Sequence, residues 1–190
     1  MEKKQNRNVV HRTINTYVWL FKIAKDSFKR SESEKNWAYY DRLVSMMFCA
    51  LSLEGFFNHL VDKFALEQKI GKEKLDRKGI QNLIFQELGF EVDKNIKPFC
   101  YLGSIFEFRD EIAHAKTVNL KIVNAKMDKL GETPVLPGVK WEKMVSKETA
   151  KKFLDNTEEM ISILYQKANL PGDPFFLLWS SDFWIDHNEN

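Results

Sequence analysis

The chain has 190 residues, which is enough for one domain with a hydrophobic core and short for two. Hydrophobic residues make up 44% and charged residues 29%, as in ordinary soluble globular proteins. The net charge of +2 lacks the strongly basic character that is typical of nucleic-acid-binding domains. Basic residues do cluster before position 13, where a solvated terminus is favoured over an arm that touches phosphate.

The first residues are charged and no apolar stretch follows them, which argues against a signal peptide. Charged residues such as Glu54 interrupt the long apolar runs, so no membrane span is expected. Cys49 and Cys100 lie among apolar neighbours and are expected to be reduced core residues. The histidines are scattered and no Cys-x-x-Cys pair occurs, so we expect no metal and no cofactor. These features predict a cytoplasmic protein.

Apolar residues recur at steps of three and four from Val10 to Phe28 and predict an amphipathic helix. Residues 29–36 are polar and predict a loop. A long helix is predicted over about 37–64, and it is apolar on nearly every face, which is typical of a central, buried helix. Gly71 and the surrounding lysines predict another loop.

A shorter helix over 80–88 is predicted to stop at Gly89. Pro98 fits the first turn of the next helix, which we expect over about 97–116. Alternating apolar residues then predict a short strand over 118–122.

A second short strand at about 139–141 could pair with the first. Ser146 is expected to cap a last amphipathic helix over 150–164, and Leu170-Pro171-Gly172 ends that helix. The aromatic tail at 169–190 is expected to pack on the bundle or at a subunit interface. The pattern predicts a single all-α domain over 1–190. It is an antiparallel bundle of about five helices with an inserted loop or β-hairpin and a core at about 9–168.

The helix over 97–116 carries a group of polar residues beside an apolar stripe. On a helical wheel, Arg109, Asp110, Ala113 and His114 share one side of the helix. A guanidinium binds a phosphate through two parallel hydrogen bonds, and an imidazole exchanges protons near neutral pH. Asp110 precedes His114 by one helical turn and could orient its ring. These side chains could cleave RNA without a metal ion. On spacing alone, an exposed helix face with a capping histidine is the favoured interpretation, because an arginine and a histidine five positions apart form a very permissive pattern.

Two further residues are secondary candidates. Glu54 and Asn58 lie one turn apart on the long apolar helix. Either they satisfy each other or a loop backbone, or Glu54 pairs with Arg109 and aims it, because a carboxylate in so apolar a helix needs a partner.

The motif over 108–116 reads Phe-Arg-Asp-Glu-Ile-Ala-His-Ala-Lys and resembles the Arg-x4–6-His signature of the HEPN superfamily of helical ribonuclease-like domains, including its Abi-like members. The segment over 50–60, Ala-Leu-Ser-Leu-Glu-Gly-Phe-Phe-Asn-His-Leu, resembles the apolar helix that precedes the motif in related bacterial proteins. The resemblance covers about 9–168. Lys116 stands where some toxin members carry a tyrosine that a partner modifies, so that mode of regulation is not implied.

The resemblance implies a homodimer in which the two motif helices meet and each site draws on both subunits. It implies an RNA substrate and a role in toxin–antitoxin, antiphage or stress systems. We therefore expect a metal-independent endoribonuclease that uses Arg109, His114 and Asp110. The alternatives are a non-catalytic module that binds RNA, a nucleotide or a protein, and the antitoxin or regulatory half of a two-gene system.

Overall fold

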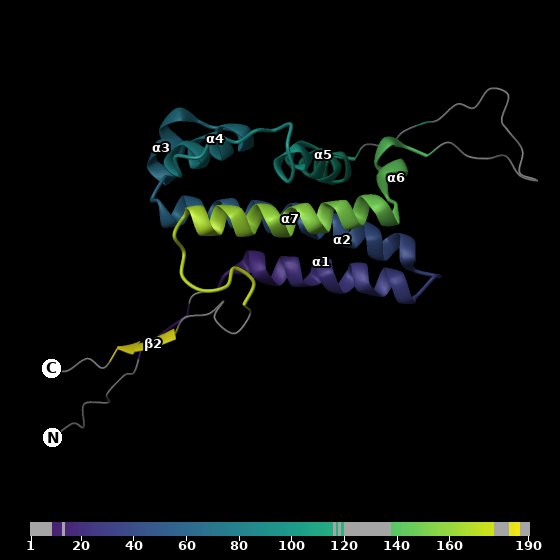
Figure 1. Cartoon of the computed structure of the whole chain (residues 1–190), viewed down its shortest axis with the longest axis horizontal. Coiled ribbons are helices and arrows are strands. Elements are labelled where there is room, and N and C mark those ends of the chain that lie inside the picture. Colours follow the sequence, from purple (N-terminus) through teal and green to yellow (C-terminus); the bar gives the residue numbers. More distant parts are fainter. Residues whose placement is uncertain are drawn as a thin grey trace, which may run out of the picture.

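The computed structural model describes residues 9–12, 14–115, 117, 119, 138–176 and 183–186, with the backbone alone for 9–12 and 183–186 (Figure 1). Its elements in chain order are β1 (Val9–Arg12), α1 (Thr16–Ser33), α2 (Ala38–Lys63), α3 (Glu67–Glu73), α4 (Arg77–Glu87), the 3₁₀ turn η1 (Phe99–Tyr101), α5 (Leu102–Ala113), α6 (Lys140–Met144), α7 (Lys147–Lys167) and β2 (Phe183–Asp186).

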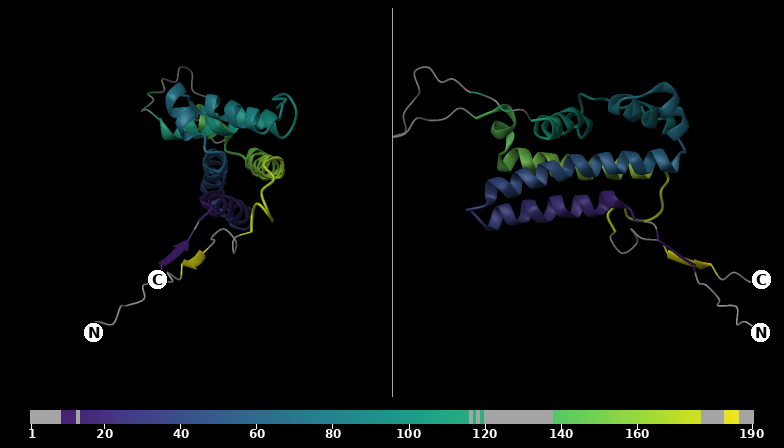
Figure 2. Two further views of the ribbon diagram at one scale, coloured as in Figure 1. Left: turned by 90° about the vertical axis from the view of Figure 1, so that its left-hand side faces the viewer. Right: turned by 180° about the vertical axis from the view of Figure 1, so that it is seen from behind.

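The helices form three layers, as Figures 1 and 2 show. α1 lies on one side, α2 and α7 run side by side in the middle, and α3, α4 and α5 cover the other side. The expected all-α class is confirmed, and the described residues contain seven α-helices rather than about five. β1 and β2 add one short antiparallel ladder, in which Val9 pairs with Asp186 and Arg12 with Phe183.

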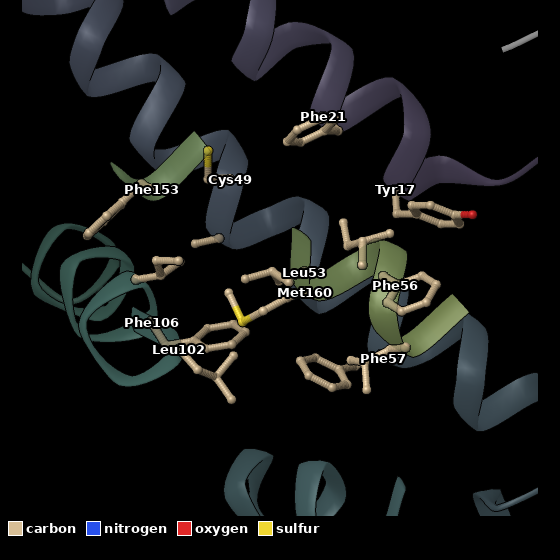
Figure 3. Packing of buried hydrophobic residues seen from close by; sticks show 14 of the residues in the cluster. Tyr17, Phe21, Cys49, Leu53, Phe56, Phe57, Leu102, Phe106, Phe153 and Met160 are labelled. Carbon is tan, nitrogen blue, oxygen red and sulfur yellow. The ribbon is translucent and has the colours of Figure 1, made fainter. Parts of the chain in front are cut away.

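The central position predicted for α2 is confirmed. It contacts α1, α4, α5 and α7. Its residues Met46, Leu53 and Leu60 have no exposed surface, because a helix that is apolar on every side is stable only when neighbours cover it. Figure 3 shows Leu53 packed against Met160 of α7, beside Leu102 and Phe106 of α5. α2 therefore supplies the surface on which α5 is placed.

α2 is also long and apolar enough to cross a membrane by length and composition, and it is the one such helix in the part of the chain that the structure describes. The structure buries 56% of its most apolar window among the other helices. This burial is compatible with the core helix of a soluble protein.

The backbones of α1 and α2 come close together at Gly55. A Cβ atom at this position would lie 3.3 Å from the Cβ of Tyr17. One turn away, the buried Ser52 hydroxyl donates to the Tyr17 carbonyl at 2.9 Å. This glycine and this hydroxyl together fix the start of α1 against α2.

Two predicted helix boundaries need correction at the N-terminal end. The helix expected from Val10 begins only at Thr16, because Val9–Arg12 pair with β2 instead. The loop expected over 29–36 is helical as far as Ser33. Two serines of this last turn bond to the helix backbone: Ser31 donates to the Phe28 carbonyl at 2.7 Å, and Ser33 donates to the Arg30 carbonyl at 3.1 Å.

The loop expected around Gly71 is in fact the short helix α3, which ends where Lys74 adopts a left-handed conformation with φ of 51°. The strand expected at 139–141 is also wrong, because Lys140 begins α6. The Glu142 side chain accepts a hydrogen bond from the Val139 backbone N–H at 2.8 Å, which favours the start of a helix. The strand expected at 118–122 lies outside the described residues, apart from Asn119.

Other local predictions are confirmed. α4 ends at Glu87, and Gly89 follows with a φ of +57°. The Ser146 side chain caps α7 by accepting the Thr149 backbone N–H at 3.0 Å. The two cysteines differ, however. Cys49 is buried, which raises the pKa of its thiol to about 12, whereas Cys100 is exposed because its neighbour Phe99 turns into the core instead.

In the described part of the aromatic tail, Phe175 packs against α1. The ring of Phe175 lies 4.6 Å from that of Phe21 on α1. The tail then pairs with the N-terminal segment through β2. The tail residues 177–182 and 187–190 lie outside the described residues.

Candidate functional site

α5 holds the predicted motif against α2 and α4. Its residues Leu102, Ile105, Phe106 and Phe108 are each at most 4% exposed, and they orient the helix by burying its apolar stripe. Because the apolar stripe is buried, Arg109 and Asp110 lie at its edges, where they contact α2 and α4. The motif is therefore placed by core packing.

The predicted pairing of Arg109 with Glu54 is present in the structure. One Arg109 nitrogen, Nη2, donates to both Glu54 carboxylate oxygens at 3.0 and 3.2 Å. The other nitrogen, Nη1, donates to Asp110 at 2.9 Å. The side chain of Arg109 is only 23% exposed, so these two carboxylates are its main compensation for lost water.

A second arginine completes this cluster. Arg77 makes a two-pronged contact with Asp110, with its Nη1 at 2.9 Å and its Nη2 at 2.6 Å from the two carboxylate oxygens. Its guanidinium also lies over the Phe106 ring, 4.5 Å from the ring centre. Asp76 caps α4 by accepting the Gly79 backbone N–H at 2.8 Å, and so places Arg77 in the first turn.

Glu54, Arg109, Asp110 and Arg77 thus form one continuous network, which we call the arginine–carboxylate network. The hydrogen bonds from Arg77, and then those from Arg109, lower the pKa of Asp110 to about 2. The same contact raises the pKa of Arg77. The network joins two guanidiniums to two carboxylates, so its formal charges cancel.

An open groove of about 1040 Å³ lies beside this network, between α4, α5 and α6. We call it the α5–α6 groove. Its described walls include Arg77, Lys78, Asp110, His114 and Trp141. Glu107 and Glu111 also line it, and both pair with Lys140 at the start of α6. The groove therefore combines an imidazole, two cations and an indole ring with carboxylates that are mostly paired.

His114 lies at the mouth of the groove as the C-cap of α5. Its backbone N–H donates to the Asp110 carbonyl at 3.0 Å, and its side chain is exposed. The imidazole makes no hydrogen bond or ion pair with any described residue. Asp110 does not orient it as expected, because Arg77 and Arg109 already occupy the carboxylate.

The structure separates the predicted residues into three groups. Asp110 and His114 both line the α5–α6 groove, whereas Arg109 is not among its described wall residues and lies toward α2. Glu54 belongs to the network through Arg109. Asn58 is exposed and forms no hydrogen bond with Glu54 or with any other described residue.

Sequence reasoning missed Arg77, Lys78 and Trp141. Arg77 contacts Asp110 across 33 positions of sequence, so no local spacing links them. The available signal was Asp110 itself, because a carboxylate beside an apolar stripe calls for a cation on a neighbouring helix. Among the described residues, no group of three or more His, Cys, Asp or Glu side chains is arranged to hold a metal ion.

Comparison with protein-family models, curated proteins and solved structures finds no match to this chain.

Proposed function

We propose that this protein is a metal-independent endoribonuclease whose site is the α5–α6 groove. The observation that carries the proposal is that His114 faces an open groove without a hydrogen-bond partner among the described residues, beside the guanidinium of Arg77 and the ammonium of Lys78. A proton-transfer group next to cations is what cleavage of an RNA phosphodiester requires. The resemblance of the motif to HEPN domains supports the same function.

The reaction we propose is an internal phosphoryl transfer. The ribose 2′-oxygen attacks the neighbouring phosphorus, and the bond to the 5′-oxygen breaks. The products are a 2′,3′-cyclic phosphate and a 5′-hydroxyl. The 2′-hydroxyl loses its proton and the leaving 5′-oxygen gains one. His114 carries out one of these two transfers as base or acid, and water carries out the other. Arg77 and Lys78 stabilise the charge that develops on the non-bridging oxygens.

In this proposal Arg109 is a positioning residue. It is bound on one side by Glu54 and on the other by Asp110, so it holds the carboxylate that in turn orients Arg77. Arg109 could bind a phosphate directly only after one of these contacts opens. This reassigns the phosphate-binding role that the motif gave to Arg109.

A specific observation favours the alternative, a non-catalytic module that binds RNA, a nucleotide or a protein. Both guanidiniums of the network already have carboxylate partners, and the groove walls contain Glu107, Asp110, Glu111 and Glu142 against two cations. Such a groove attracts phosphate less strongly than a basic groove does.

The test is to incubate the purified protein with mixed RNA in EDTA and to analyse the new ends. The variants are His114→Ala and Arg77→Ala, with Lys151→Gln as the matched control, because Lys151 pairs only within the exposed face of α7. We expect the parent and the control to leave cyclic phosphate ends, and the other two to lose at least 100-fold in rate. Absence of cleavage, or equal cleavage by all four proteins, would refute the nuclease proposal and favour the binding-module alternative.

We also propose that the active species is a homodimer with α5 at its interface, and that an antitoxin or other regulatory protein controls it. Light scattering should give twice the chain mass of 22.4 kDa. If the protein has the mass of a monomer and still cleaves RNA fully, the proposal of a site shared between two subunits is refuted and the nuclease proposal stands.

A further inference from the structure

A second hollow, which we call the α1–α7 pocket, lies on the opposite side of the α2 and α7 layer from α5. Its volume is about 510 Å³, within the usual range of small-ligand sites. Its described walls come from the start of α1, from α2, and from the end of α7 with the turn that follows. Figure 1 shows this turn folding back from α7 toward the start of α1.

Tyr17 brings a polar group into this pocket. Its side chain is 2% exposed, and its ring packs edge-on against Phe56 at 5.0 Å and beside His59 at 5.6 Å. Figure 3 shows its hydroxyl directed away from the labelled core side chains. The hydroxyl makes no hydrogen bond to another described residue. A phenol fixed this firmly at a pocket wall can bind a ligand without losing further freedom.

The charge of the pocket indicates what kind of ligand fits. Asp173 is the single charged side chain among the described residues that line it. One carboxylate oxygen, Oδ1, accepts the Phe175 backbone N–H at 2.8 Å, and the group makes no ion pair with another described residue. Burial lowers the pKa of His59, which disfavours a positive charge on its ring. The described walls therefore have one formal negative charge, on the exposed Asp173, and no Lys or Arg.

The rest of the wall is largely apolar and aromatic. Leu170, Pro171 and Pro174 line it together with the rings of Tyr17 and Tyr165. The Tyr165 hydroxyl donates to the Pro171 carbonyl, which holds the turn in place. Aromatic rings beside a carboxylate favour an organic cation, because both attract positive charge while the walls cover apolar atoms.

We infer that the α1–α7 pocket binds a small organic amine, with its ammonium group at Asp173 and its apolar body against Tyr17, Tyr165 and the turn. The Tyr17 hydroxyl donates to an oxygen on the ligand where one is present. A phosphate or a carboxylate is disfavoured, because no Lys or Arg lies among the described wall residues. This inference does not rest on the proposed function, since the site and the ligand charge are different.

The first test compares three probes of one shape: 2-phenylethylamine, the neutral 2-phenylethanol and the anionic 3-phenylpropionate. Binding is measured by amide chemical-shift changes in NMR spectra of the full chain. We expect the amine to bind with a Kd on the order of 1 mM and to shift amides of His59 and of residues 170–176. The alcohol and the anion should bind at least 10-fold more weakly.

The decisive variant is Asp173→Asn, which keeps an oxygen for the Phe175 N–H and removes only the charge. It should weaken amine binding at least 10-fold and leave the alcohol unaffected. Tyr17→Phe keeps the buried ring, and it should weaken tyramine, whose hydroxyl can accept the bond, more than 2-phenylethylamine. Equal binding of the three probes, unchanged amine binding by Asp173→Asn, or no binding at 10 mM would each overturn the inference.

Discussion

Replacing Asp110 by Asn removes the charge that joins Arg77 to Arg109 and keeps the size of the side chain. The pKa of Asp110 falls from its ordinary 3.8 to about 2, which is a shift of about two units. At about 1.4 kcal/mol per unit, this corresponds to an upper limit of between about 2 and about 3 kcal/mol in the free energy of unfolding. The carboxylate is 35% exposed, so water screens it, and we expect about 1 kcal/mol.

The pH dependence follows from the direction of this shift. A carboxyl with a lowered folded-state pKa stabilises the protein above its unfolded pKa and loses that effect as the pH falls through the folded value. The difference between the parent and Asp110→Asn should therefore be constant above about pH 5 and fall by about half at pH 3. Other carboxylates titrate in both proteins and cancel in the difference.

Urea denaturation followed by circular dichroism at pH 3, 4, 5 and 7 measures this difference. The matched control is Asp155→Asn, because Asp155 pairs with Lys151 on an exposed helix face and should contribute no more than about 0.5 kcal/mol. A difference for Asp110→Asn that stays the same from pH 7 to pH 3, or that equals the control, would refute the reasoning that the network stabilises the fold through this charge.

Three other variants test the site and the fold. Glu54→Gln leaves Arg109 with one carboxylate partner. Urea denaturation should therefore show a loss of about 1–2 kcal/mol in the free energy of unfolding, and RNA cleavage should slow. Full stability together with full activity would exclude a positioning role for Glu54. Gly103→Ala should stabilise by about 0.5–1 kcal/mol, because no heavy atom beyond its chain neighbours and its own helix backbone lies within 4 Å of the new methyl group. A lower midpoint of thermal unfolding would contradict this. Ser146→Ala removes the cap on Thr149 and should cost about 1 kcal/mol in the same measurement, whereas no change would mean that the cap adds nothing.

Local sequence patterns predicted the fold correctly where a single nearby feature determines the position or the end of a helix. The apolar faces of α2 predicted its central position, Gly89 predicted the end of α4, and Ser146 predicted the start of α7. The pattern failed at 139–141, because two alternating apolar residues are too few to distinguish a strand from one helical turn. It failed at Val10 as well, because the partner of β1 lies at the other end of the chain.

The candidate site shows the same division. The apolar neighbours of Glu54 and Arg109 suggested that the two groups pair, since each needs an opposite charge, but they left a pairing of Glu54 with Asn58 or with a loop backbone equally open. The capture of Asp110 by Arg77 depends on how α4 packs over α5, and no spacing in the sequence encodes this contact. The packing of α5 on α2 turns Arg109 toward Glu54 and away from the α5–α6 groove, and no spacing in the sequence encodes this either.

The pairing of β1 with β2 brings the two ends of the described chain together, because Val9 lies opposite Asp186. A circular permutant can therefore be designed, in which a peptide bond joins the natural termini and the chain begins at the exposed turn near Lys74. This new start lies between α3 and α4 and preserves every helix. In such a circular permutant, α7 would be followed by α1 and then α2. The three helices that meet in the core would become neighbours in sequence. The sequence separation of the contacts between β1 and β2, between α1 and α7 and between α2 and α7 would fall. Stopped-flow refolding should therefore be faster than in the natural order.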